Sequence, residues 1–186
     1  MVALLIWLIP LIIIAVIALS FFIFYNRFVS LTNQIDNALS QIDVQLKRRA
    51  DLIPNLLESV KGYMKHERGV ITEVTNARKA LVGAESLPDR VKAGNKLQSA
   101  LGRLFAIAEN YPNLKANETF LQLQQELSAT EDKIAYSRQY YNDGIMSYNV
   151  SATTIPGKWF ASLYGFQKKE YLQIPASARE VVKVRF

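Results

Sequence analysis

The sequence contains no cysteine and only one histidine, His66. The absence of cysteine excludes disulfides, thiolate nucleophiles and cysteine-ligated zinc or iron–sulfur sites, although it does not reveal the compartment. A Ser-His-Asp triad would have to be built on His66, and the HExxH zinc motif is missing because His66-Glu67 is followed by RGVI. A ferritin-type di-iron bundle needs a pair of histidines and is excluded in that form. We expect His66 to be an exposed residue near a helix end.

Phosphate-binding loops are also missing. Gly157-Lys158 lacks the preceding glycine and the Ser/Thr of a Walker A loop, and no GxGxxG motif follows a strand pattern. Several carboxylates occur, but no spacing forces them to converge, and we expect them to pair with Lys47, Arg48, Arg49 and Arg138. The carboxylates in question are Asp43, Asp51, Glu58, Glu131 and Asp132. We therefore predict no catalytic residue, no metal site, no cofactor and no enzymatic activity.

No charged side chain precedes Arg27. Residues 2–25 (VALLIWLIPLIIIAVIALSFFIFY) have Ser20 as their polar interruption, and about 20 apolar residues suffice to cross a bilayer as a helix. Pro10 is tolerable in such a helix, and aromatic rings near both ends suit the headgroup level. We predict a transmembrane anchor at residues 1–26. A cleaved secretory signal is the alternative, but it needs a preceding basic region and a shorter apolar run.

The distribution of basic residues predicts the orientation of the anchor. Arg27 and the run at residues 47–49 (KRR) follow the span, whereas only the α-amine precedes it. The positive-inside tendency therefore places the N-terminus outside and the C-terminal domain in the cytoplasm.

Beyond the anchor, apolar residues recur at steps of three and four, which is typical of amphipathic helices. The first stripe keeps its phase across Pro54, so we predict either one long helix kinked there or two helices that meet just before it. This stripe consists of Phe28, Leu31, Ile35, Leu39, Ile42, Leu46, Ala50, Ile53, Leu57, Val60 and Met64.

Three further stripes complete the helical pattern. One follows Gly69 and stops at Gly83, the next begins near residues 86–88 (SLP) and stops at residues 110–113 (NYPN), and the last spans residues 120–148. Amphipathic helices with short connections bury their stripes by packing together. We predict an all-α fold: a single transmembrane helix followed by an antiparallel, coiled-coil-like bundle of long helices at residues 27–150, and then an aromatic and basic segment at residues 151–186.

Two groups of polar or aromatic residues are candidate interaction sites. The first combines charged and amide side chains, and it predicts either an interhelical network that fixes register or a protein-docking face. The second interleaves rings with lysines beyond the bundle, and it predicts an interfacial membrane contact, a cap on the bundle core, or both together. The first group is Arg48, Arg49, Asp51, Asn55, Glu131 and Arg138, and the second is Trp159, Phe160, Tyr164, Phe166, Lys168 and Lys169.

Residues 41–56 (QIDVQLKRRADLIPNL) closely resemble the signature of the LemA family. The likeness continues through residues 60–63 (VKGY), residues 111–116 (YPNLKA), and the dipeptides Tyr141-Asn142 and Tyr148-Asn149. It implies a bacterial inner-membrane protein with one N-terminal helix, an outside N-terminus and a cytoplasmic helical bundle. The resemblance supplies no activity and no catalytic residues.

Together these observations predict a membrane-anchored scaffold or protein-interaction module. Its expected partners are membrane lipid, through the N-terminal helix, and other membrane or cytoplasmic proteins, with self-assembly into a homo-oligomer as a further option. The alternative is a lipid-contacting membrane-remodelling or envelope-stress factor. The net charge of +6 is spread over mixed-sign helix faces, so we expect no nucleic-acid partner.

Overall fold

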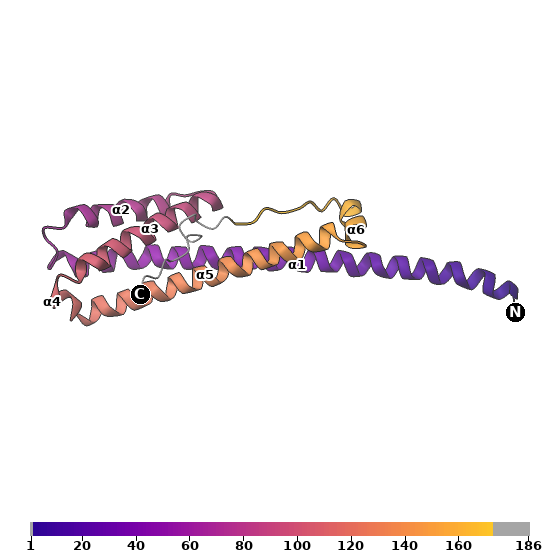
Figure 1. Ribbon diagram of the computed structural model, residues 1–186, viewed down its shortest axis with the longest axis horizontal. Helices are drawn as coiled ribbons and strands as arrows, with labels where there is room; N and C mark the ends of the chain where they lie inside the picture. The colour runs from indigo at the N-terminus through magenta and orange to yellow at the C-terminus, as the bar shows by residue number, and fades with distance from the viewer. Residues whose placement is uncertain (1, 173–186) are drawn as a thin grey trace, which may run out of the picture. The chain divides into compact units, whose positions relative to one another are not determined.

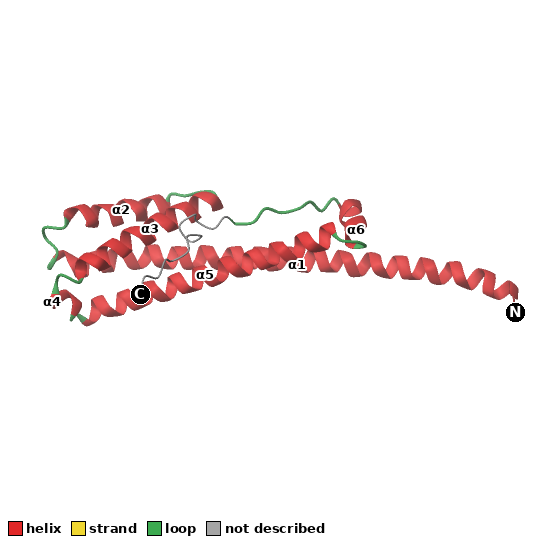
Figure 2. Ribbon diagram, in the orientation of Figure 1, coloured by secondary structure: helices red, strands yellow, loops and turns green. Residues whose placement is uncertain are grey.

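The computed structural model describes residues 2–172, with side chains from Trp7 onward, and these residues form helices without a strand (Figure 2). The all-α prediction is confirmed. The described chain divides into two compact units: unit 1 holds residues 2–38 and 139–172, and unit 2 holds Leu39–Arg138. The helices are α1 (Val2–Lys61), α2 (Arg68–Val82), α3 (Leu87–Ala108), α4 (Pro112–Lys115), α5 (Glu118–Thr153) and α6 (Gly157–Tyr164), as labelled in Figure 1.

The helix ends follow local chemistry. Helix α1 runs through both Pro10 and Pro54, so the alternative of two helices meeting before Pro54 is wrong. Helix α3 begins after Ser86, whose hydroxyl accepts a hydrogen bond from the Asp89 amide at 3.2 Å and so satisfies a free N–H of the first turn. The single turn of α4 was not predicted; it starts at Pro112 because proline is pre-organised for the first helical position.

Unit 2 is an up-down bundle in which consecutive long helices run in opposite directions (Figure 1). Most residues of the predicted stripes are buried here, but Leu39 and Leu57 are half-buried, and Leu56 is fully buried in place of Leu57. Leu56 and Leu57 both lie at a permitted helical step between Ile53 and Val60, so spacing cannot choose between them. The core of unit 2 includes Ile42, Leu46, Ile53, Val60, Val74, Leu97, Leu104, Leu127 and Ile134.

Aromatic side chains make up much of the interior of unit 1. The first part of α1, the second part of α5 and α6 surround a core of Phe28, Ile35, Ile145, Tyr148 and Ala161. Helix α6 ends at Tyr164 and is capped by Gly165, which has φ 74° in the left-handed region that glycine adopts without steric cost. Residues 165–172, called the strap below, then run without helix or strand.

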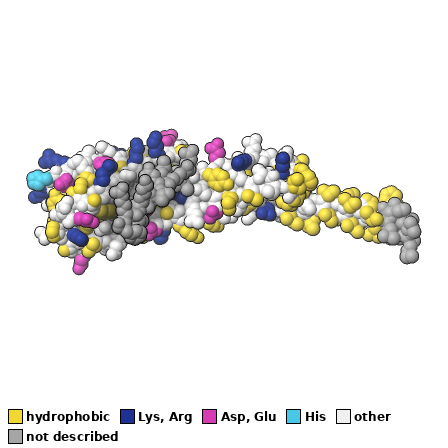
Figure 3. Space-filling model, viewed as in Figure 1, with side chains coloured by type: hydrophobic (Ala, Val, Ile, Leu, Met, Phe, Trp, Pro, Cys, Tyr) yellow, Lys and Arg dark blue, Asp and Glu magenta, His cyan; other side chains and the backbone are white. Residues whose placement is uncertain are grey.

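The N-terminal part of α1 is exposed and apolar. An 18-residue window within it has a mean hydropathy of 2.8 and is 0% buried, so this helix is long and apolar enough to cross a membrane by length and composition. Hydrophobic side chains cover this part of α1 in Figure 3.

Candidate functional site

The first candidate site is centred on Arg49, a charged side chain buried in unit 2 with 1% of its surface exposed. Its Nε donates to Thr130 Oγ1 at 3.2 Å, and its Nη2 forms an ion pair with the Glu131 carboxylate. Thr130 in turn donates its hydroxyl proton to the Leu127 carbonyl at 2.7 Å. Removing a guanidinium from water costs several kcal/mol unless it is paired, and Thr130 and Glu131 of α5 supply the partners of Arg49 on α1.

Arg138 extends this network to α3. Its Nη1 donates to Asn95 Oδ1 at 3.1 Å. Burial lowers the pKa of the Arg138 guanidinium; the Glu131 carboxylate opposes this shift and the Arg49 guanidinium adds to it. Arg49 therefore links α1 to α5 and Arg138 links α5 to α3, and the Glu131 carboxylate, which pairs with Arg49, also acts on the charge of Arg138.

The other predicted polar residues lie outside this network. Arg48 pairs with Glu126 at 3.7 Å, in an exposed ion pair, while Asp51 and Asn55 are exposed on α1. Asp51 lines a groove of about 350 Å³ in unit 2, whose other walls come from α1, α2, α3 and the loop between α2 and α3. The structure thus brings together Arg49, Glu131 and Arg138 of the six predicted residues. Asn95 was missed because nothing in the sequence distinguishes it from other helical amides.

The groove contains one ion pair of its own. Asp43 Oδ2 accepts a hydrogen bond from Arg90 Nη1 at 2.7 Å, and Arg90 also donates to the carbonyls of Ala84 and Glu85 at 3.2 Å. This arginine therefore ties the loop between α2 and α3 to α1. Within the described residues, no group of three or more Asp, Glu or His side chains could hold a metal ion, and His66 is exposed in the turn after α1.

The second candidate site lies in unit 1, where α6 packs against α1 at the end of its apolar segment. The rings of Phe24 and Phe160 stack at 4.8 Å between centroids with an interplanar angle of 11°. The Tyr164 ring lies 4.7 Å from that of Phe21, and its hydroxyl donates to the Phe21 carbonyl at 2.7 Å. Burial raises the pKa of the Tyr164 hydroxyl, and Tyr25 adds to the shift. The inner face of α6 is thereby fixed on α1.

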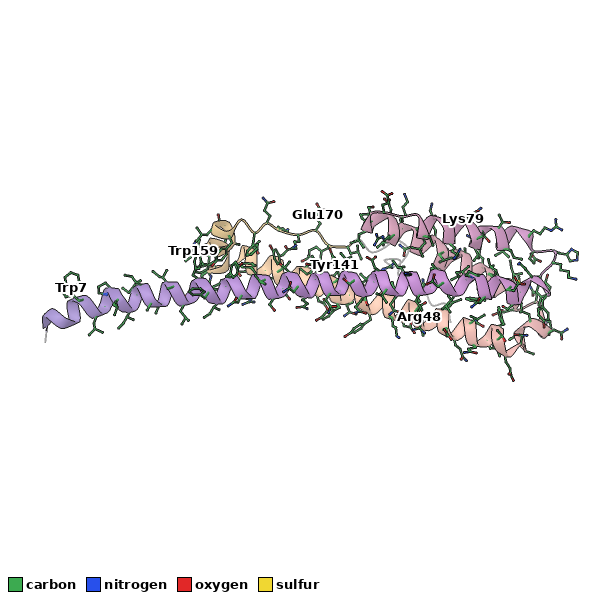
Figure 4. All side chains as sticks on the ribbon, turned by 180° about the vertical axis from the view of Figure 1, so that it is seen from behind. Trp7, Arg48, Lys79, Tyr141, Trp159 and Glu170 are labelled. Carbon is green, nitrogen blue, oxygen red and sulfur yellow. The ribbon has the colours of Figure 1, made fainter. Side chains whose placement is uncertain are left out.

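The predicted membrane-contact residues fall into two sets. Phe160, Tyr164 and Phe166 are half-buried against α1 and α5, and their rings pack on the core of unit 1. Trp159 is 63% exposed on the opposite face of α6 (Figure 4), next to Leu163 at 68% exposure. Helix α6 therefore covers the core of unit 1 with its inner rings and also exposes apolar side chains on its outer face.

The predicted lysines differ as well. Lys168 is exposed, whereas Lys169 is half-buried with its ammonium 5.2 Å from the centre of the Tyr148 ring. Two asparagines of α5 hold the strap: Asn149 bonds the backbone of Lys169, and Asn142 bonds that of Leu172. Their sequence signal was the Tyr-Asn dipeptide that recurs after seven residues, which by itself indicated only the family resemblance.

Comparison with known proteins matches residues 38–186 to the model described as the LemA family. Magnetosome protein MamQ 2 of Paramagnetospirillum magneticum is 27% identical over 175 residues, covering 80% of this chain and 64% of the relative. Magnetosome protein MamQ of Magnetospirillum gryphiswaldense is 28% identical over 173 residues, covering 79% and 64%. Protein LemA of Metamycoplasma hominis is 31% identical over 118 residues, covering 63% and 54%. The chain thus spans less than two thirds of the length of these relatives.

Proposed function

This chain belongs to the LemA family, and we propose that it is a membrane-anchored, non-catalytic scaffold that presents helical surfaces to other membrane or cytoplasmic proteins. The observation that carries the proposal is the way the apolar segment is built into unit 1. The Phe24–Phe160 stack and the hydrogen bond from the Tyr164 hydroxyl to the Phe21 carbonyl attach α6 to the end of that segment. The span is thereby part of a folded unit that also contains the end of α5.

The surface of unit 1 supports a binding role. Met146 and Val150 are exposed on α5 one turn apart, although apolar side chains at this spacing ordinarily face a core. Grouped exposed apolar residues mark contacts with proteins or membranes more often than isolated ones do.

A photo-crosslinking residue at Val150 of the full-length chain tests this proposal in native membranes. Lys133, an exposed polar position on the same helix, provides the matched control. We expect discrete protein adducts from position 150 that disappear when Met146→Glu is added, and none of these adducts from position 133. Adducts that are equal at both positions, or insensitive to the Met146 change, would contradict a specific docking surface.

We also propose that the protein resides in the bacterial inner (cytoplasmic) membrane as a single-pass protein, with its N-terminus outside and its C-terminal domain in the cytoplasm. The support is the uncharged segment before Arg27 and the basic run after it. Protease added to intact spheroplasts should leave the C-terminal domain uncut and should digest it only after lysis. Digestion from the outside would overturn this orientation.

A second candidate function is direct lipid contact, as in a membrane-remodelling or envelope-stress factor. The outward face of α6 favours it, because Trp159 and Leu163 are exposed on a helix held at the end of the apolar segment. Indole rings favour the headgroup level, and each nearby lysine adds on the order of 1 kcal/mol of attraction to an anionic leaflet.

Trp159 fluorescence in the full-length chain distinguishes lipid contact from simple exposure. A fragment without the anchor is unsuitable, because it would lack Phe21 and Phe24, which pack against α6. With Trp7→Phe as background, we expect Trp159 emission to shift blue and aqueous quenching to fall as the anionic lipid fraction of the nanodisc rises. Emission and quenching that do not respond to lipid composition would remove the lipid candidate.

A further inference from the structure

The strap is held to α5 through its backbone. Asn149 accepts a hydrogen bond from the Lys169 N–H at 2.9 Å and donates to the Lys169 carbonyl at 2.9 Å. Asn142 repeats the arrangement with Leu172, accepting at 2.9 Å and donating at 3.3 Å. A primary amide carries a donor and an acceptor side by side, so each asparagine satisfies both polar groups of one backbone residue.

The spacing of the two asparagines matches an extended peptide of three-fold periodicity. Seven residues of α-helix separate Asn142 from Asn149, which corresponds to about 10.5 Å along α5. Three residues of extended chain, the separation of Lys169 and Leu172, span roughly 9–10 Å. Burial in the strap has the same period, since Phe166, Lys169 and Leu172 are half-buried and the residues between them are exposed.

Two side chains of the strap add selectivity to these backbone contacts. The Phe166 ring lies 4.8 Å from the Phe28 ring and 5.7 Å from the Tyr164 ring. The Lys169 ammonium lies over the Tyr148 ring, where the negative face of the aromatic attracts a cation. The site thus takes an extended segment with an aromatic residue followed by a basic residue three positions later.

We propose that Asn142 and Asn149, with the surrounding rings, form a binding site for an extended peptide, and that the strap of a second copy of this chain occupies it in exchange for the resident strap. An identical segment reproduces the four asparagine bonds and the contact of Lys169 with the Tyr148 ring, and such swapping is a low-cost route to dimers. The Phe166 N–H stays bonded to the Ala161 carbonyl of its own α6 at 2.9 Å, so the chain changes course after Phe166 and the exchanged part carries Lys169 and Leu172. Confinement to one bilayer raises the effective concentration of neighbouring straps, a step that rests on the anchoring proposed above.

Complementary full-length variants test the exchange, and the cysteine-free chain allows each to carry a single label. Variant A combines Asn142→Leu and Asn149→Leu with a donor dye at Glu170→Cys, so its strap is intact and its site is lost. Variant B combines Lys169→Pro and Leu172→Pro with an acceptor dye at Met146→Cys, so its site is intact and its strap lacks both N–H donors. Mixed in the same liposomes, A and B should show energy transfer.

Two controls use the same lipid and labels. Adding the two asparagine changes to B empties its site and sets the background transfer. The second control restores Lys169 and Leu172 in B and carries Glu170→Pro instead. The N–H groups of Lys169 and Leu172 are then present, so the strap of B competes with the strap of A for the site of B, and energy transfer should fall.

Transfer from A to B at the background level, with helical circular dichroism unchanged in both variants, would overturn the exchange and restrict the strap to its own chain. The scaffold proposal is tested independently of the exchange. Its Val150 adducts should persist in the chain with Asn142→Leu and Asn149→Leu, and their absence from the unaltered chain would refute the scaffold without affecting the exchange.

Discussion

The two units of this molecule are stabilised by different side chains. Within the described residues, nine aromatic ring pairs lie in unit 1 and one lies in unit 2. Five ion pairs lie in unit 2, which has a mainly aliphatic core. Rings with polar edges suit the boundary between lipid and water, whereas paired charges suit a surface in water. Unit 1 contains the apolar segment of α1, so the choice of side chains follows the solvent that we propose for each unit.

The comparison also indicates how each unit could be held in register. In unit 2 we expect a buried charge to hold the register, because the partners of Arg49 on α1 both lie on α5. In unit 1 we expect close packing around Gly157 to hold the register, because the missing side chain leaves room for the Ser151 carbonyl and for the Phe24 ring. The following substitutions test this difference, from the largest expected effect to the smallest.

Leu46→Asp should have the largest effect, because it places an unpaired charge at a position of unit 2 that is 3% exposed. We expect a loss of more than about 4 kcal/mol in the free energy of unfolding. Urea unfolding followed by circular dichroism measures it, and Val44→Asp, at a 56% exposed position, should cost less than about 0.5 kcal/mol. The fluorescence of Trp159, in unit 1, should lose its folded signal later than the ellipticity does; coincident transitions would contradict two separate cores.

Glu131→Leu should cost about 2 kcal/mol, because it leaves the buried Arg49 guanidinium without its carboxylate. This figure is below the range for fully buried pairs because Glu131 is 30% exposed. Adding Arg49→Met should recover most of the loss, since an apolar replacement of both partners removes the unpaired charge. If the free-energy cost of the double variant equals the sum of the costs of Glu131→Leu and Arg49→Met, the ion pair is not what holds unit 2 in register.

Gly157→Ala should destabilise unit 1 by about 1–3 kcal/mol, as overpacking does. A methyl group here would overlap the Ser151 carbonyl oxygen and lie 3.4 Å from Phe24 Cε1. The Trp159 emission should therefore show earlier release of α6 in urea. Gly102→Ala in α3 is the matched control: its methyl group meets nothing within 4 Å, and a stabilisation of about 0.5–1 kcal/mol is expected. Equal effects of the two changes would refute the packing role of Gly157.

Arg48→Ala should have the smallest effect, below about 0.5 kcal/mol, because its pair with Glu126 is exposed and screened by salt. Urea midpoints at low and high salt measure it. A cost comparable to that of Glu131→Leu would mean that exposure does not separate the two neighbouring arginines.

The sequence by itself determined the class of fold and the helix pattern, because steps of three and four residues define a helical face without knowledge of its partner. Gly83, Ser86 and Pro88 likewise marked the ends of α2 and α3 through local backbone chemistry. The uncharged run before Arg27 identified the candidate span. These features are local in the chain, so local physics was sufficient.

Tertiary structure alone decided which polar and aromatic residues meet. Arg48 and Arg49 are adjacent and chemically alike, yet the packing of α5 on α1 buries one and exposes the other. Trp159 and Phe160 separate in the same way on the two faces of α6. Asn142 and Asn149 have partners 30 and 20 residues further along the chain, which no spacing rule reaches. The phase of a helix fixes which residues share a face, but only the neighbouring helix determines which face becomes the inside.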